Sequence, residues 1–150
     1  IKFIQLRSKA SLDHIYIKKI HNLCKENQAK LILNTPNKTF NELCDGWHLT
    51  SLALMSLKER PVIEEKLIGA STHNIDEALH AENIPADYIS LSPIENTLTH
   101  SNSSPLGWED ASGFIEKCNL PVFLLGGMNK ELVEKALSIG AQGVAGIRGI

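Results

Sequence analysis

The stretch Pro121-Val122-Phe123-Leu124-Leu125-Gly126-Gly127 is an apolar run that ends in two glycines. A short apolar run bounded by turn residues is typical of a strand that is buried on both faces. After the glycines, Asn129 is placed to cap a helix that Gly140 ends, and residues 143–147 form a further strand-like run. A strand, a helix and a second strand in this order indicate the crossover unit of a parallel sheet.

The same alternation runs through the whole chain, so we expect one α/β domain over residues 1–150. Strands are predicted at residues 2–6, 30–34, 46–49, 67–71, 87–91, 121–125 and 143–147. Helical patterns separate them, with Ser11 as the expected cap of the first helix and an Asn74–Glu77 capping box on a later one. A (β/α)8 TIM barrel and a doubly wound sheet both satisfy this order. Polar residues just after almost every strand favour the barrel.

The chain length bears on how much of a barrel is present. A complete (β/α)8 barrel needs about 200 residues or more, whereas this sequence has 150. The chain also begins in an apolar run, without a leading methionine. We therefore expect a fragment of a barrel that lacks the first strand and the last helix.

The composition is that of an ordinary globular domain, with 43% hydrophobic and 21% charged residues. A net charge of -2 gives no support for nucleic-acid binding, and no apolar run approaches the roughly 20 residues of a membrane span. The three cysteines, Cys24, Cys44 and Cys118, are scattered and form no CxxC motif. This pattern favours a cytoplasmic protein with reduced, buried thiols.

Polar side chains follow the first two predicted strands. In the run Gln5-Leu6-Arg7-Ser8-Lys9, alternate residues share one face, so Gln5, Arg7 and Lys9 can converge on one ligand. Arginine and lysine match phosphate, and glutamine matches an amide or a ring edge. Asn34 is either a turn residue or a polar contact at the barrel mouth, and the sequence leaves both interpretations open.

The middle strands carry two histidines with different expected roles. His48 lies inside a short apolar strand, which is typical of a satisfied core histidine rather than a catalyst. Ser71 and His73 lie two residues apart at a strand end, where they can face the same side. His73 is the candidate general acid or base, with ligand contact and a purely structural role as the alternatives. No orienting carboxylate for a Ser71–His73 nucleophile pair is evident.

The later loops are candidates for binding an anion. Thr97 and Thr99 place alternate hydroxyls in a polar loop that runs on to Pro105. Gly126 and Gly127 let backbone N–H groups approach an anion closely. In barrels, the loops after the seventh and eighth strands often form the phosphate site, so Ile147 and Arg148 are expected to complete it. No metal-ligand cluster is evident in the sequence, so no metal site is expected.

These motifs together resemble thiamine phosphate synthase and its TenI-type relatives, which are (β/α)8 barrels. The likeness is carried, in order, by Gln5-Leu6-Arg7-Ser8-Lys9, Leu31-Ile32-Leu33-Asn34, Asp45-Gly46-Trp47-His48-Leu49, Gly69-Ala70-Ser71-Thr72-His73, Thr97-Leu98-Thr99, Gly126-Gly127 and Gly143-Val144-Ala145-Gly146-Ile147. The synthase joins a pyrimidine diphosphate to a thiazole phosphate and releases pyrophosphate. The resemblance implies a small phosphorylated pyrimidine or thiazole as the binding partner of this chain.

The resemblance also implies roles for individual residues. Gln5, Arg7, Lys9 and Asn34 would contact the pyrimidine diphosphate, with Ser71 near its leaving group. The thiazole phosphate would be held by residues of three loops, namely Thr97, Thr99, Gly127, Ile147 and Arg148.

The sequence departs from the synthase at its metal ligands. Thr35 and Ala53 stand where the synthase has the aspartates that bind Mg²⁺, and His100 replaces its lysine after the threonine loop. We therefore expect no Mg²⁺ cofactor. TenI-type proteins also lack these aspartates, and one branch isomerises a thiazole carboxylate phosphate with a histidine at the place of His73.

A closer likeness is to TenI-like domains fused behind MutT-type nudix hydrolases. It rests on Thr50-Ser51, Leu54-Met55, Arg60-Pro61 and Ser104-Pro105-Leu106-Gly107-Trp108-Glu109. A fused nudix domain would then precede Ile1. Three functions remain open: a metal-independent thiazole phosphate tautomerase, a non-catalytic ligand-binding module of such a fusion, and a residual thiamine phosphate synthase.

Overall fold

The computed structural model describes residues 2–8, 13–34, 36–61, 65–96 and 104–147. Its strands are β1 (Phe3–Leu6), β2 (Lys30–Asn34), β3 (Gly46–Leu49), β4 (Leu67–Thr72), β5 (Tyr88–Leu91), β6 (Val122–Leu125) and β7 (Gly143–Ala145). The α-helices are α1 (His14–Glu26), α2 (Ser51–Ser56), α3 (Ile75–Asn83), α4 (Trp108–Ile115) and α5 (Val133–Ser138). Two short 3₁₀ helices are η1 (Lys38–Leu43) and η3 (Lys130–Leu132).

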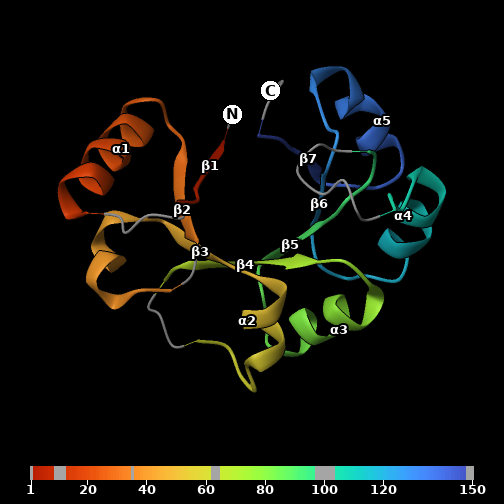
Figure 1. Ribbon diagram of the computed structural model, residues 1–150, viewed down its shortest axis with the longest axis horizontal. Helices are drawn as coiled ribbons and strands as arrows, with labels where there is room; N and C mark the ends of the chain where they lie inside the picture. Colours follow the sequence, from red (N-terminus) through yellow and green to blue (C-terminus); the bar gives the residue numbers. More distant parts are fainter. Residues whose placement is uncertain (1, 9–12, 35, 62–64, 97–103, 148–150) are drawn as a thin grey trace.

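The seven strands form one parallel sheet in sequence order, from β1 to β7. The sheet curls so that the helices lie around its outside and the two edge strands, β1 and β7, come towards each other (Figure 1). The predicted α/β alternation is therefore confirmed, as a parallel sheet in a curled half-barrel.

Helix starts follow the capping rules, with one correction to the sequence prediction. The first helix begins after Asp13, whose side chain accepts a hydrogen bond of 2.8 Å from the Tyr16 amide. Asp13 is therefore the cap, and the predicted Ser11 lies outside the described residues. Asn129 caps η3, as predicted, and Gly140 follows α5 with a φ of +87°, in the left-handed region that glycine adopts readily.

Five strand boundaries differ from the predicted ranges, and in β1, β5 and β6 the strand starts one residue later than predicted. The last strand ends at Ala145, two residues earlier than predicted. The fourth strand extends to Thr72, whose Oγ1 donates a hydrogen bond of 3.2 Å to the Ser90 carbonyl of the neighbouring strand. This side-chain bond prolongs the pairing of β4 with β5 at the carboxyl end of the sheet.

Alternate strand residues pack on the two faces of the curled sheet. The larger core lies between the sheet and the helices, where Leu31, Leu33 and Ile68 meet Ile17 of α1 and other helix residues. Inside the curl, the rings of Phe3, Tyr88 and Phe123 lie with their centroids 5.6 to 6.3 Å apart. Offset and edge-on aromatic pairs of this kind are stabilising.

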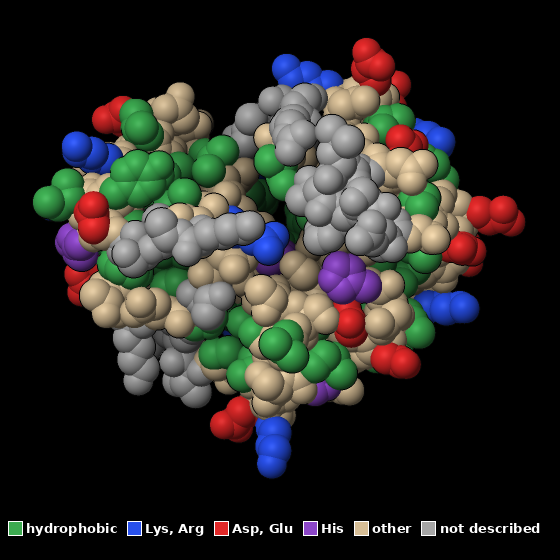
Figure 2. Space-filling view, viewed as in Figure 1, with side chains coloured by type: hydrophobic (Ala, Val, Ile, Leu, Met, Phe, Trp, Pro, Cys, Tyr) green, Lys and Arg blue, Asp and Glu red, His purple; other side chains and the backbone are tan. Residues whose placement is uncertain are grey.

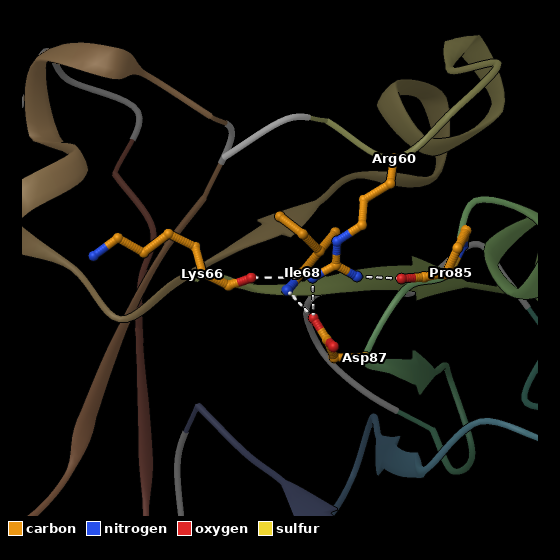
Figure 3. Close-up of polar contacts among 5 residues, drawn as sticks. All are labelled: Arg60, Lys66, Ile68, Pro85 and Asp87. Carbon is orange, nitrogen blue, oxygen red and sulfur yellow. Dashed lines mark hydrogen bonds and ion pairs between the residues drawn. The ribbon is translucent and has the colours of Figure 1, made fainter. Parts of the chain in front are cut away.

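The amino ends of the middle strands are fastened by charged side chains (Figure 3). Asp87 precedes β5, and its Oδ2 accepts hydrogen bonds of 2.7 Å from the Ile68 amide and from Arg60 Nη2. Arg60 also donates to the carbonyls of Lys66 and Pro85. These contacts join the entrances of β4 and β5, at the end of a barrel that usually serves stability.

An aspartate also joins the amino ends of β2 and β3. Asp45 precedes β3, and its Oδ2 accepts a hydrogen bond of 2.8 Å from the Leu31 amide in β2. Lys66 Nζ donates to the Cys44 carbonyl at 2.7 Å. The three cysteines are free thiols, of which Cys24 and Cys44 are buried. No helix within the described ranges is long and apolar enough to cross a membrane.

Candidate functional site at the carboxyl ends of the strands

Gln5 and Asn34 meet on adjacent strands at the inside of the sheet. Gln5 Nε2 donates a hydrogen bond of 3.0 Å to Asn34 Oδ1, which joins β1 to β2. Asn34 therefore makes a polar contact at the strand ends. Arg7 follows β1, and its positive charge contributes to the lowered pKa of His48 in β3. The convergence of Gln5, Arg7 and Lys9 on one ligand stays a prediction, and Lys9 lies outside the described residues.

His48 is the centre of a buried polar cluster that joins three strands. Its Nδ1 lies 3.2 Å from the Tyr88 hydroxyl, and its Nε2 lies 3.0 Å from Ser71 Oγ and 3.4 Å from Ser90 Oγ. The side chain is only 4% exposed. Burial, with a smaller contribution from Arg7, lowers the pKa of His48 to about 4, so the ring is neutral at physiological pH. The expectation of a satisfied core histidine is confirmed.

His73 is exposed and lies just after the end of β4. Its Nδ1 lies 2.7 Å from the Ser92 carbonyl oxygen, which can only accept, so Nδ1 carries the proton. Its backbone N–H donates to Glu77 Oε2 at 2.8 Å, while Asn74 Oδ1 accepts from the Glu77 amide at 2.9 Å. The predicted capping box is thus present, with its return bond one residue earlier than usual.

Ser71 and His73 do not form a nucleophile pair. Ser71 is bonded to His48 inside the barrel, whereas His73 is bonded to the connection after β5. Within the described residues no hydrogen bond joins the two side chains. Because the partners differ, the two residues can serve separate roles at the same edge of the sheet.

Gly126 and Gly127 lie directly against the connection that follows β5. Both have left-handed φ values, of +96° and +74°. A Cβ on Gly126 would lie 2.8 Å from Pro93 Cα, and one on Gly127 would lie 2.7 Å from Glu95 Cβ. Only glycine fits this close approach in this backbone conformation.

Backbone hydrogen bonds lock the same connection on both sides. The amides of Ile94 and Glu95 donate to the carbonyls of Leu125 and Gly126, at 3.0 and 3.1 Å. On the other side, the amides of Leu106 and Gly107 donate to the carbonyls of Pro93 and Ile94, at 2.9 and 3.0 Å. The segment is therefore held between β6 and the start of α4, which fixes its position beside the glycines.

A second contact beside the connection after β5 is centred on Trp108, which meets Glu95 and Lys135. Trp108 Nε1 donates to Glu95 Oε1 at 2.8 Å, and Lys135 Nζ lies 4.1 Å from the centroid of the Trp108 ring. None of these side chains is predicted from the sequence as part of the site. The spacing between Glu95 and Trp108 gives no periodic signal, so the contact emerges only from the fold.

Several predicted site residues lie outside the described part of the chain. They are Lys9, Thr97, Thr99 and Arg148, together with Thr35 and His100 of the family comparison. Ile147 is described and is 73% exposed just after β7. Figure 2 shows this face of the molecule, with hydrophobic, basic and histidine side chains around a central hollow.

The side chains present do not match a magnesium site at the place of Ala53. Ala53 has no ligand atom, it packs against the core, and its amide donates to Thr50 Oγ1 at 3.2 Å. In the ranges that the structure describes, no group of three or more His, Cys, Asp and Glu residues could hold a metal ion. Mg²⁺ favours carboxylate oxygens, and Ala53 supplies none at this place.

A curled parallel sheet whose strands follow the sequence order, with helices around its outside, is the architecture of the class of α/β barrel proteins. The sequence profile of the thiamine monophosphate synthase family matches residues 1–150. The chain belongs to this family.

Individual relatives agree with the family assignment. The chain is 35% identical to the thiamine-phosphate synthase of Fusobacterium nucleatum, over 100% of this chain and 75% of that protein. It is 32% identical to the putative thiamine-phosphate synthase 2 of Aquifex aeolicus, over 98% of this chain and 81% of that protein.

Solved structures share the fold. The thiamine phosphate pyrophosphorylase of Pyrococcus furiosus superposes with a TM-score of 0.75 at 24% identity, covering 96% of this chain and 71% of that one. A 3-hexulose-6-phosphate synthase gives a TM-score of 0.65 at 13% identity, covering 97% of this chain and 78% of that one. These likenesses show the architecture alone.

Proposed function

We propose that this chain binds a thiazole phosphate and moves a proton on it without a metal, as a tautomerase linked to thiamine metabolism. The observation that carries this proposal is the geometry of His73. Its Nδ1–H is held by the Ser92 carbonyl, which leaves the Nε2 lone pair as the basic site on an exposed ring. A neutral imidazole fixed in one tautomer is suited to general base catalysis.

The proposed chemistry needs only one titrating group. His73 Nε2 takes a proton from one carbon of the substrate, and the C–H electrons move into the ring system. The imidazolium then returns the proton to another carbon, so the substrate is isomerised and the enzyme is unchanged. The Ser92 carbonyl accepts from Nδ1–H throughout and stabilises the charged intermediate form of the ring.

The proposed ligand lies across the carboxyl ends of several strands. The phosphate would bind at Gly126, Gly127 and the backbone near Ile147 and Arg148, with Thr97 and Thr99 beside it. The rest of the ligand would face Gln5, Arg7, Lys9, Asn34 and Ser71. Two observations support this placement: the glycines are in the left-handed region against a fixed connection, and the charge of Arg7 acts on His48.

A second candidate is residual thiamine phosphate synthase activity, which the identity to proteins of that name favours. Pyrophosphate release from a diphosphate depends on a bound metal that neutralises the leaving charge. Ala53 supplies no metal ligand, so we place this activity second.

The test is turnover of the thiazole carboxylate phosphate by the wild type, His73→Gln and His73→Ala. We expect both variants to lose at least a hundredfold in kcat, the usual contribution of a general base, with binding retained. His14→Gln, a change on the exposed surface of α1, serves as the matched control and should keep full activity.

Each other result selects a different function. Equal rates for the wild type and His73→Ala would remove His73 from the mechanism. Binding without turnover by the wild type would identify a ligand-binding module, of the kind that could serve a fused nudix hydrolase. Thiamine phosphate formed only with Mg²⁺ and both phosphorylated substrates would establish the synthase reaction.

A further inference from the structure

The His48 cluster, made of His48, Ser71, Tyr88 and Ser90, contains a buried ring whose two nitrogens bond to hydroxyl groups. Tyr88 contacts Nδ1, whereas Ser71 and Ser90 contact Nε2. A neutral imidazole has one donor and one acceptor nitrogen, and a hydroxyl group can play either part. The tautomer of His48 therefore decides which hydroxyl protons are engaged by the ring and which remain available to a ligand.

The direction of the hydrogen bond between Tyr88 and Nδ1 decides the tautomer of His48. The phenol is half-buried, and burial, with a smaller effect of Asp87, raises its pKa, so the hydroxyl keeps its proton. Among the described residues, His48 Nδ1 is the recorded partner of this hydroxyl. When Tyr88 donates to Nδ1, the ring proton resides on Nε2.

We propose that His48 is a positioning residue that holds Ser71 as a hydrogen-bond donor towards the ligand. In this arrangement the Nε2–H donates to Ser71 Oγ at 3.0 Å, so the proton of Ser71 is not engaged by the ring. Ser71 is half-buried near the end of β4, whereas Ser90, at 3.4 Å, is buried. The hydroxyl of Ser71 then selects a ligand that presents an acceptor, such as a carboxylate oxygen or an unprotonated ring nitrogen.

The inference rests on the proposed function for the identity of the ligand, but the tautomer does not. A protein labelled with ¹⁵N-histidine separates the two cases, because protonated and unprotonated ring nitrogens resonate in distinct ranges. We expect the wild type to show the Nε2–H form of His48, with no protonation down to pH 5. The Nδ1–H form, or a titration near pH 6, would overturn the proposal.

Tyr88→Phe tests the cause of the tautomer. The phenyl ring keeps the packing against Phe3 and Phe123 and removes only the hydroxyl. We expect the Nε2–H form to lose its dominance in this variant and to be unaffected by Tyr16→Phe, an exposed control on α1. An unchanged tautomer in Tyr88→Phe would show that Tyr88 does not set it.

Binding of the thiazole carboxylate phosphate then tests the consequence. We expect Ser71→Ala to raise Kd about tenfold, the loss of one hydrogen bond, and Tyr88→Phe to raise Kd by a smaller factor. In the double variant the two effects should not multiply, because both act through the Ser71 hydroxyl. Fully multiplicative effects would contradict the positioning role. If the wild type does not bind this probe, the proposed function fails together with the ligand role of Ser71, whereas the spectra decide the tautomer independently.

Discussion

The two ends of the curled sheet use similar residues for opposite purposes. At the amino ends, Asp87 and Arg60 are paired with each other and with backbone groups of neighbouring strands. At the carboxyl ends, Arg7 has no ion pair with any carboxylate in the described ranges, and His73 is exposed. At the amino ends, opposite charges pair with each other and stabilise the sheet. At the carboxyl ends, the charge of Arg7 can interact with the proposed ligand.

Between these ends, the interior changes from apolar to polar. The rings of Phe3 and Phe123 pack with Tyr88, and the hydroxyl of Tyr88 reaches His48 on the side of the candidate site. Gly69 makes this possible, because a Cβ there would lie 2.1 Å from the Tyr88 ring. Tyr88 thus belongs to both regions, through its ring and its hydroxyl.

The largest expected effect is on the pH dependence of the free energy of unfolding. It arises at His48, which lies between the two ends of the sheet. Its folded pKa of about 4 lies below the unfolded value of 6.5, so the unfolded chain binds more protons between these values. The free energy of unfolding should therefore rise with pH across this window, and the His48 contribution should be lost as pH falls from 6.5 towards 4. The shift corresponds to roughly 3 kcal/mol.

Urea unfolding of His48→Asn and His14→Asn at several pH values measures this contribution. The slope should flatten in His48→Asn and stay as in the wild type in His14→Asn, where the side chain is exposed. Burial also lowers the pKa of His21, with Lys25 adding to the effect, so some slope of the same sign should remain. Identical slopes in the two variants would show that His48 is not held neutral by burial.

The next effect should be confined to the amino ends. Asp87→Ala removes the acceptor of the Ile68 amide and the partner of Arg60, which should lower the free energy of unfolding by roughly 2 kcal/mol. Affinity for the thiazole phosphate should be unchanged. Chemical denaturation and calorimetry measure the two quantities, with Asp110→Ala on exposed α4 as the control. A comparable loss of affinity would mean that the two ends are not separate.

The smallest effect on stability is expected for a substitution at Gly127. In contrast to Asp87→Ala, this change should also weaken ligand binding. Gly127→Ala places a Cβ at a φ of +74° and 2.7 Å from Glu95 Cβ, which should cost about 1 kcal/mol of stability. The displaced backbone should weaken binding of the thiazole phosphate about tenfold, equivalent to about 1.4 kcal/mol. Gly113→Ala, at an open helical position, is the control. Unchanged affinity in Gly127→Ala would remove this loop from the phosphate site.

Much of the fold could be predicted from the sequence because each strand is a short apolar run bounded by turn residues. The strands β2 and β3 match their predicted ranges. The start of the first helix could not be predicted from the hydrophobic periodicity. Ser11 and Asp13 are both good caps, and periodicity alone does not decide between them.

The candidate site could be predicted in part for a similar reason. Alternation along β1 predicts Gln5 on the inner face, and its hydrogen bond to Asn34 of β2 agrees with this prediction. The hydrogen-bond partners of His48 are harder to predict from the sequence, because Tyr88 lies 40 residues away and the contact depends on the order of the strands. Alternation marks Tyr88 and Ser90 as sharing a face, but it does not say which histidine they meet.

The contact of Trp108 with Glu95 has a practical consequence for measurement. The chain has two tryptophans, and Trp47 is 1% exposed in the core between the sheet and the helices. The indole of Trp108 is bonded to Glu95, whose Cβ is the nearest neighbour of Gly127. In a Trp47→Phe protein, the fluorescence of Trp108 would come from this place alone. The protein therefore carries a built-in optical probe beside its proposed phosphate site, which allows titrations without a labelled ligand.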